Sequence, residues 1–173
     1  MWSILGNIFG DSAKKNIFKP DIKIINKSVD VQGNGELKVL RVEVKNEGSN
    51  NANDIEADLV KIIDPGDKLR TVIISPLWWM DNQFRQGDQR LNDIPMHQAR
   101  WLDIGNLFQI ANGYQLRLSN AVFRSNDEST KVSPGVTQLE IHFNVKQGHQ
   151  KKFMVSVNWD GSFNDPSIEW REA

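Results

Sequence analysis

Hydrophobic and polar residues alternate with a period of two over most of the chain beyond its first dozen residues. The segments LEIHFNV (139–145) and KFMVSVNW (152–159) alternate strictly. Such alternation gives a strand one apolar face and one polar face, which is typical of antiparallel sheet. The linker KQGHQKK (146–152) is polar and contains Gly148. The pattern therefore predicts a hairpin whose loop is longer than the two-residue minimum.

A second pair of alternating segments lies between Leu40 and Ile62 and is separated by EGSNNAN. Leu40, Val42 and Val44 share one face of the first segment, and Ile55, Ala57 and Leu59 share one face of the second. The separating residues tolerate positive φ or bond to their own backbone, so we expect the chain to reverse there into another hairpin. The apolar faces predict a core that includes Val42, Val44, Leu59, Ile141, Phe143 and Val155.

Shorter apolar segments with turn signals between them complete the pattern. DIKII (21–25), RTVIIS (70–75), ARWLDI (99–104) and QLRLS (115–119) are expected strands, and DPGD (64–67) is a turn. NLFQIANGY (106–114) is compatible with a short helical turn or a loop. Seven or eight strands with no helical period between them predict a mainly β, antiparallel sandwich.

The first ten residues have a different, helical period. On a helix wheel, Met1, Trp2, Ile4, Leu5, Ile8 and Phe9 fall on one side, and Lys14, Lys15 and Lys19 follow. This predicts a short amphipathic helix whose attachment face comprises Trp2, Leu5, Ile8 and Phe9. An apolar wedge followed by cations fits a membrane interface, whereas docking on the chain's own sandwich or on another copy fits equally well. Gly6 and Gly10 weaken an isolated helix, so we expect it to form against a surface.

Composition narrows the function classes. The 173 residues carry a formal net charge of −1, which argues against a nucleic-acid partner. Cysteine is absent, which excludes disulfides and thiolate metal sites. The apolar start lacks a preceding basic residue and is interrupted by Gly6 and Asn7, unlike a secretory signal. We expect a cytoplasmic protein, with peripheral association with the membrane as an open alternative.

The segment from Leu37 to Ile63 carries a resemblance. Its carriers are Val42, Val44, Asn46, Gly48, Ala52, Ile55, Ala57 and Leu59. This pattern resembles the early strands of prokaryotic immunoglobulin-like domains of the cell-adhesion-related (CARDB-like) and fibronectin type III-like kind. The resemblance implies an immunoglobulin-like sandwich that acts as an interaction or spacer domain, and it transfers no functional residues. We expect an N-terminal segment and connector at 1–19 and a sandwich at 20–173, with an insertion around 69–113.

Tryptophans are the next candidates for function. Adjacent residues on a strand point to opposite faces, so Trp78 and Trp79 cannot both enter one core. An exposed tryptophan with a nearby arginine can stack on a sugar and bond to its hydroxyls. Trp79, or its neighbour, together with Arg85 is therefore the expected ligand or partner contact.

Catalytic signatures are absent. His142 lies on the polar side of its strand and His149 in a turn, so neither is evidently paired with a carboxylate and a nucleophile. No nucleophile elbow, zinc motif or phosphate loop occurs. Asp160, Ser162 and Asn164 alternate as calcium ligands do, but Asp165 and Arg171 occupy positions that need Gly and Glu, so a turn is expected. No cofactor, metal or catalytic residue is predicted.

These observations predict a non-enzymatic interaction or attachment module that docks on a protein, on its own copy or on a membrane surface. The alternative is a module that binds carbohydrate or another ligand through an exposed tryptophan. A third hypothesis is an enzyme with a site in the central insertion.

Overall fold

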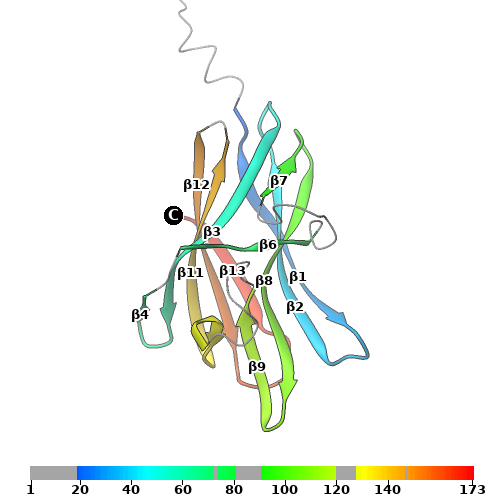
Figure 1. Ribbon diagram of the computed structural model, residues 1–173, viewed down its shortest axis with the longest axis vertical. Coiled ribbons are helices and arrows are strands. Elements are labelled where there is room, and N and C mark those ends of the chain that lie inside the picture. The colour runs from blue at the N-terminus through cyan, green and yellow to red at the C-terminus, as the bar shows by residue number, and fades with distance from the viewer. Residues whose placement is uncertain (1–18, 72–73, 81–90, 120–127, 147) are drawn as a thin grey trace, which may run out of the picture.

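The computed structural model describes residues 19–71, 74–80, 91–119, 128–146 and 148–173. Their strands form two antiparallel sheets that lie as two layers (Figure 1). Sheet A has six strands: β1 (Ile22–Gln32), β2 (Leu37–Asn46), β6 (Trp78–Trp79), β8 (Ala99–Ile110), β9 (Gly113–Leu118) and β10 (Lys131–Val132). Sheet B has seven: β3 (Ala52–Asp64), β4 (Lys68–Arg70), β5 (Ser75–Pro76), β7 (Leu91–Ile94), β11 (Gly135–Val145), β12 (His149–Trp159) and β13 (Ser167–Glu172). The prediction of a mainly β sandwich is confirmed at this level.

The chain passes repeatedly between the two sheets. Sheet A has the order β1-β2-β8-β9-β10, and sheet B has the order β13-β12-β11-β3-β4. β2 and β3 therefore lie in different sheets, and the predicted hairpin between them is wrong. Alternation identifies a strand but not its partner. The hairpin partner of β2 is β1, across the residues 33–36 that contain Gly33 and Gly35, both with positive φ.

The core lies between the two sheets and confirms the predicted inward faces. Phe143 is completely buried, and its ring contacts Phe153 edge to face at a centroid distance of 5.5 Å. On its other side the ring of Trp79 lies 6.2 Å away. The six predicted core residues are all buried: Val42, Val44, Leu59, Ile141, Phe143 and Val155.

Other predicted elements differ in extent. The β11–β12 hairpin is confirmed, but its loop is only residues 146–148, since Val145 already pairs with His149. DIKII is the first part of the longer strand β1. NLFQIANGY is neither a helical turn nor a loop, because it contains the end of β8, the turn and the start of β9. β13 was not predicted, and it pairs along β12 from Asn158 to Phe153.

The central segment contributes strands to both sheets. β5 pairs with β3 in sheet B, and β6 pairs with β8 in sheet A, so the chain crosses between layers within residues 75–79. Leu77 and Trp79 are fully buried, whereas Trp78 between them is only partly buried. Within the range 69–113 that was expected to be an insertion, β8 lies in the interior of sheet A.

Asn46 connects three parts of the fold at the upper end of the sandwich. It is fully buried, and its Oδ1 accepts hydrogen bonds from the backbone N–H groups of Asp21 (3.1 Å) and Gly48 (3.0 Å). Its Nδ2 donates to the carbonyl oxygens of Asn50 (2.7 Å) and Ile94 (3.0 Å). All the hydrogen-bonding capacity of this amide group is therefore used to join the chain before β1, the β2–β3 loop and β7.

Gly48 is required by the close approach of the chain that precedes β1. A Cβ atom at Gly48 would lie 2.1 Å from the Lys19 carbonyl oxygen and 2.4 Å from the Asp21 nitrogen. Both are backbone atoms, so a larger residue would displace the chain. The Asn-x-Gly pattern in this loop therefore leaves a gap beside Gly48, the Gly48 notch, in which the backbone of residues 19–21 lies.

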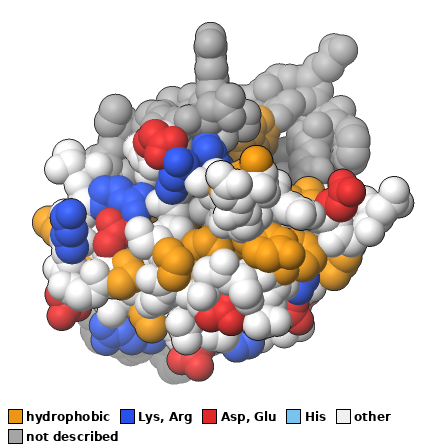
Figure 2. All heavy atoms as spheres, turned by 90° about the horizontal axis from the view of Figure 1, so that it is seen from below, with side chains coloured by type: hydrophobic (Ala, Val, Ile, Leu, Met, Phe, Trp, Pro, Cys, Tyr) orange, Lys and Arg blue, Asp and Glu red, His pale blue; other side chains and the backbone are white. Residues whose placement is uncertain are grey.

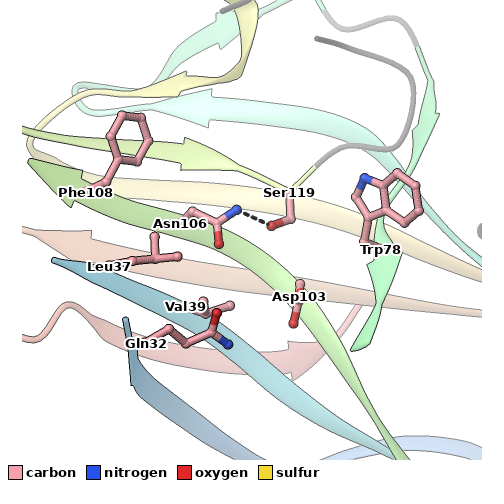
Figure 3. A pocket seen from close by; sticks show the side chains of 8 residues that line it. All are labelled: Gln32, Leu37, Val39, Trp78, Asp103, Asn106, Phe108 and Ser119. Atoms are coloured by element: carbon pink, nitrogen blue, oxygen red, sulfur yellow. Dashed lines mark hydrogen bonds between the residues drawn. The ribbon is translucent and has the colours of Figure 1, made fainter. Parts of the chain in front are cut away.

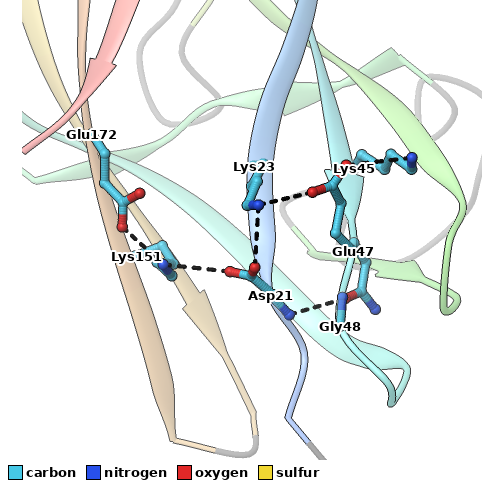
Figure 4. Close-up of polar contacts among 8 residues, drawn as sticks. Asp21, Lys23, Lys45, Glu47, Gly48, Lys151 and Glu172 are labelled. Atoms are coloured by element: carbon cyan, nitrogen blue, oxygen red, sulfur yellow. Dashed lines mark hydrogen bonds and ion pairs between the residues drawn. The ribbon is translucent and has the colours of Figure 1, made fainter.

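Ion pairs surround this entry point (Figure 4). Lys151 on β12 contacts Asp21 at 3.4 Å and Glu172 on β13 at 2.8 Å. Lys23 lies 2.8 Å from Glu47, and this hydrogen bond raises the pKa of Lys23 and lowers the pKa of Glu47. Asp21 therefore links the start of sheet A to sheet B, and it fixes the place where the chain enters the fold.

Asp160 organises the turn between β12 and β13. Its carboxylate accepts hydrogen bonds from the Ser162 hydroxyl (2.7 Å), the Ser162 N–H (2.8 Å) and the Asn164 amide (3.1 Å). These hydrogen bonds lower the pKa of Asp160 to about 2, and the bond from the Ser162 hydroxyl contributes most. The predicted turn is confirmed.

We expect the Asp160 carboxyl to titrate near pH 2 in a carbon-detected NMR titration, below the ordinary value of 3.8. Because the folded pKa is the lower one, the associated stabilisation is complete above 3.8 and is lost as the pH falls through about 2. Ser162→Ala should raise the pKa, whereas Ser167→Ala, on the neighbouring strand, should leave it unchanged. A normal pKa in the unmodified protein would contradict the hydrogen bonds.

The predicted N-terminal helix with Trp2, Leu5, Ile8 and Phe9 lies outside the described residues. Within those residues, no helix has the length and apolar character needed to span a membrane.

Candidate functional site

A pocket of about 620 Å³ lies on the outer face of sheet A (Figure 3). Its size falls within the range of roughly 300–1,000 Å³ that is usual for small-molecule sites. It is lined by Gln32, Leu37, Val39, Trp78, Asp103, Asn106, Phe108 and Ser119. The lining therefore mixes two aromatic rings, aliphatic side chains, amides, a hydroxyl and a carboxylate.

The strand register brings these residues together from distant parts of the chain. Val39 pairs with Asn106, Leu37 with Phe108, and Gln32 with Leu37. Trp78 pairs with Asp103 on the same strand β8. Their neighbours Leu40, Leu102 and Leu107 are buried in the core. Alternation along the strands thus directs the pocket residues to the outer face.

Trp78 and Phe108 stand at opposite sides of the pocket in Figure 3. Of the two tryptophans considered for a ligand contact, Trp79 is completely buried and packs on Phe143. Its neighbour Trp78 is the residue that lines the pocket. The guanidinium of Arg117 lies 5.9 Å from the centre of the Phe108 ring and covers that ring from β9.

Polar groups lie between the two rings. The Asn106 Nδ2 donates to the Ser119 hydroxyl at 3.0 Å, which fixes the orientation of the amide. The other side of this amide, Oδ1, has no hydrogen-bond partner among the described residues. Among the described residues, the Gln32 side chain and the Trp78 indole N–H also have no hydrogen-bond partner. The pocket therefore presents donors and acceptors that are available to a ligand.

A buried charge network lies beside these groups. Arg41 Nε donates to Asp103 Oδ1 at 2.6 Å, and the exposed fractions of the two side chains are only 4% and 6%. The Arg41 guanidinium also pairs with Asp30 on β1. Burial opposes the charge of Arg41, but the hydrogen bonds to Asp103 and Asp30 prevail and raise its pKa. Asp103 is thus held in an ion pair with Arg41 at the edge of the pocket.

The sequence also singled out Arg85 and the histidines. Arg85 lies outside the described residues. The His142 Nε2 lies 2.7 Å from Glu140 Oε1 on the outer face of sheet B. Within the described ranges, no group of three or more His, Cys, Asp and Glu side chains is arranged to hold a metal ion.

A second feature lies at the lower end of the sandwich. Hydrophobic side chains form a band across this end when it is seen from below (Figure 2). Tyr114 at the start of β9 stacks on Phe163 with 5.2 Å between ring centres. Lys38 lies 4.5 Å over the Phe163 ring and bonds to the Phe163 carbonyl oxygen and Asp165, both at 2.6 Å. These contacts fix the β12–β13 turn against sheet A.

Of the pocket residues, the sequence singled out only Trp78, as the neighbour of Trp79. Gln32, Asn106 and Ser119 carry no motif, and each lies in a separate part of the chain. Comparison of the chain with protein-family models, curated proteins and solved structures finds no match.

Proposed function

We propose that the protein is a non-enzymatic binding module that holds a small ligand in the pocket beside Trp78. The main observation in its support is a group of polar atoms between two aromatic rings on one face of sheet A, which have no hydrogen-bond partners among the described residues. An aromatic ring with free polar neighbours is the usual means by which a protein orients a small molecule. The site also lies on regular strands rather than on isolated loops, which favours a fixed geometry.

The fold supports a binding rather than a catalytic role by analogy. We infer an immunoglobulin-like sandwich, because β2 and β8 are neighbours in one sheet while β3, β11 and β12 are neighbours in the other. In this reading β6 occupies the edge position beside β8, and β9 and β13 are additions. Immunoglobulin-like sandwiches host many functions, so the pocket carries the proposal and the topology only supports it.

Trp78→Ala should weaken ligand binding by about tenfold or more, since it removes the ring on which a ligand stacks. The screen is a panel of soluble metabolites and oligosaccharides, followed by isothermal titration calorimetry with each compound that raises the melting temperature. Trp101→Ala is the matched control: Trp101 lies two residues before Asp103 on β8 but does not line the pocket. Equal loss in both variants, or no binding to the unmodified protein, would contradict the proposal.

A second candidate function is attachment through the first ten residues. It is favoured by the apolar face of Trp2, Leu5, Ile8 and Phe9 and by the anchored connector. The contacts of Asp21 with Asn46 and Lys151 give this segment a defined point of departure from the sandwich. Such a module would present its pocket at a membrane surface or on a partner chain.

Deletion of residues 1–11 should leave the sandwich folded, because the Gly48 notch and the Asn46 bonds involve residues from Lys19 onwards. It should abolish either vesicle binding or self-association, measured by co-sedimentation with liposomes that contain anionic lipid and by analytical ultracentrifugation. Lipid binding should weaken as salt increases if Lys14, Lys15 and Lys19 contribute. If the full chain is monomeric and does not bind vesicles, the attachment function is wrong.

A further inference from the structure

We propose that the ligand of the pocket is a neutral sugar, bound with one ring face against Trp78 and its hydroxyl groups on the amides between the rings. This inference rests on the proposed binding function and specifies the chemical class of the ligand. It follows from three properties of the lining: its rings, its unpaired polar atoms and its charge.

The aromatic rings of Trp78 and Phe108 favour a ligand with an apolar face. Trp78 lines the pocket while its β8 partner Asp103 supplies the polar edge beside it. The C–H face of a pyranose packs on such a ring and leaves its hydroxyl groups at the perimeter. Phe108 closes the opposite side, and Arg117 covers it from β9.

The polar atoms call for a ligand that both donates and accepts hydrogen bonds. Asn106 Oδ1 is an acceptor whose position is fixed by the Nδ2 bond to Ser119. The Trp78 N–H is a donor, and the Gln32 amide supplies both functions. A purely apolar ligand would desolvate these groups without replacing their bonds to water, which is costly. Sugar hydroxyls satisfy acceptor and donor groups alike.

The charge of the lining argues against anionic and cationic ligands. Asp103 is the sole charged residue among the described lining residues, and its Oδ1 is already bonded to Arg41. A second carboxylate, Asp30, contacts the same guanidinium, and Arg117 adds a positive charge over the Phe108 ring, so these four groups together carry no net charge. A charged ligand would therefore find no excess of opposite charge to pair with, whereas a neutral ligand needs none.

The test compares sugars that differ only in charge. The probes are glucose, galactose, mannose and their linear trisaccharides, each paired with the corresponding uronic acid or uronate oligomer. The readout is the indole N–H signal of Trp78 in a ¹⁵N–¹H spectrum of the full chain, assigned with Trp78→Phe. We expect at least one neutral sugar to shift this signal in a saturable manner, and its uronate to bind about tenfold more weakly or not at all.

Three results would overturn the inference. The first is a uronate that binds as tightly as its neutral sugar, and the second is a sugar that shifts only the Trp101 signal. The third is a pocket that binds an apolar or charged metabolite in the wider panel but none of the neutral sugars. In that third case the proposed binding function survives and only the ligand class is wrong, whereas no response to any compound rejects both. Asn106→Ala gives a further check: it should weaken sugar binding about tenfold while Trp101→Ala does not.

Discussion

Phe143→Ala should reduce the free energy of unfolding by roughly 3–5 kcal/mol, the range for loss of a fully buried phenylalanine ring. Phe143 has no exposed surface and contacts Phe153 and Trp79, so its removal opens a cavity between the two sheets. The change is measured by urea denaturation followed by circular dichroism at several protein concentrations.

Val136→Ala is the matched control, because Val136 lies on the same strand β11 but is 48% exposed. We expect its effect to stay within about 0.5 kcal/mol, as for most surface substitutions. If Phe143→Ala costs less than about 1 kcal/mol, the strand register is displaced by one residue and the inward face has been assigned incorrectly.

Asn46→Ala should destabilise the fold by roughly 2–4 kcal/mol, because it removes four hydrogen bonds that are buried or partly buried. The affected groups are the N–H groups of Asp21 and Gly48 and the carbonyl oxygens of Asn50 and Ile94. Hydrogen exchange should show the additional effect of faster exchange at Asp21, since that N–H is bonded to the lost side chain.

Asn144→Ala provides the comparison for this substitution. Asn144 is also an asparagine in a strand, but its bonds to Asp58 and Gln150 lie on the outer face of sheet B. We expect it to cost less than about 1 kcal/mol, because water replaces the lost partners there. Equal effects of the two substitutions would show that Asn46 does not join the chain before β1 to the sandwich.

The period of two was sufficient to predict the strand faces but not the strand partners. Phe143 was predicted as core because it alternates with the polar residues His142 and Asn144, and Val155 because it shares a face with Phe153 and Val157. The β2–β3 hairpin was wrong because both segments have buried faces that fit either sheet. The closing residues 167–172 alternate less clearly, since Ile168 is the sole aliphatic residue of β13. Pairing with β12 therefore makes it a strand, which local sequence does not reveal.

The pocket was predictable only in part, for a related reason. Adjacent side chains on a strand point to opposite faces, which predicted that Trp78 and Trp79 separate, but not which of them is buried. The crossing of residues 75–79 from sheet B to sheet A decides this by directing Leu77 and Trp79 inward. Gln32 and Asn106 come together through the register of β1, β2 and β8. A short sequence motif does not show which residues of two strands will pair.

The most direct measurement of the central claim is a set of intermolecular NOEs between the tightest-binding compound of the screened panel and the aromatic side chains. The pocket assignment predicts NOEs from the ligand to the rings of both Trp78 and Phe108, with none to Tyr114 or Phe163. NOEs confined to Tyr114 and Phe163 would place the ligand at the stack of these two rings, and the assignment of the site to the outer face of sheet A would then be wrong.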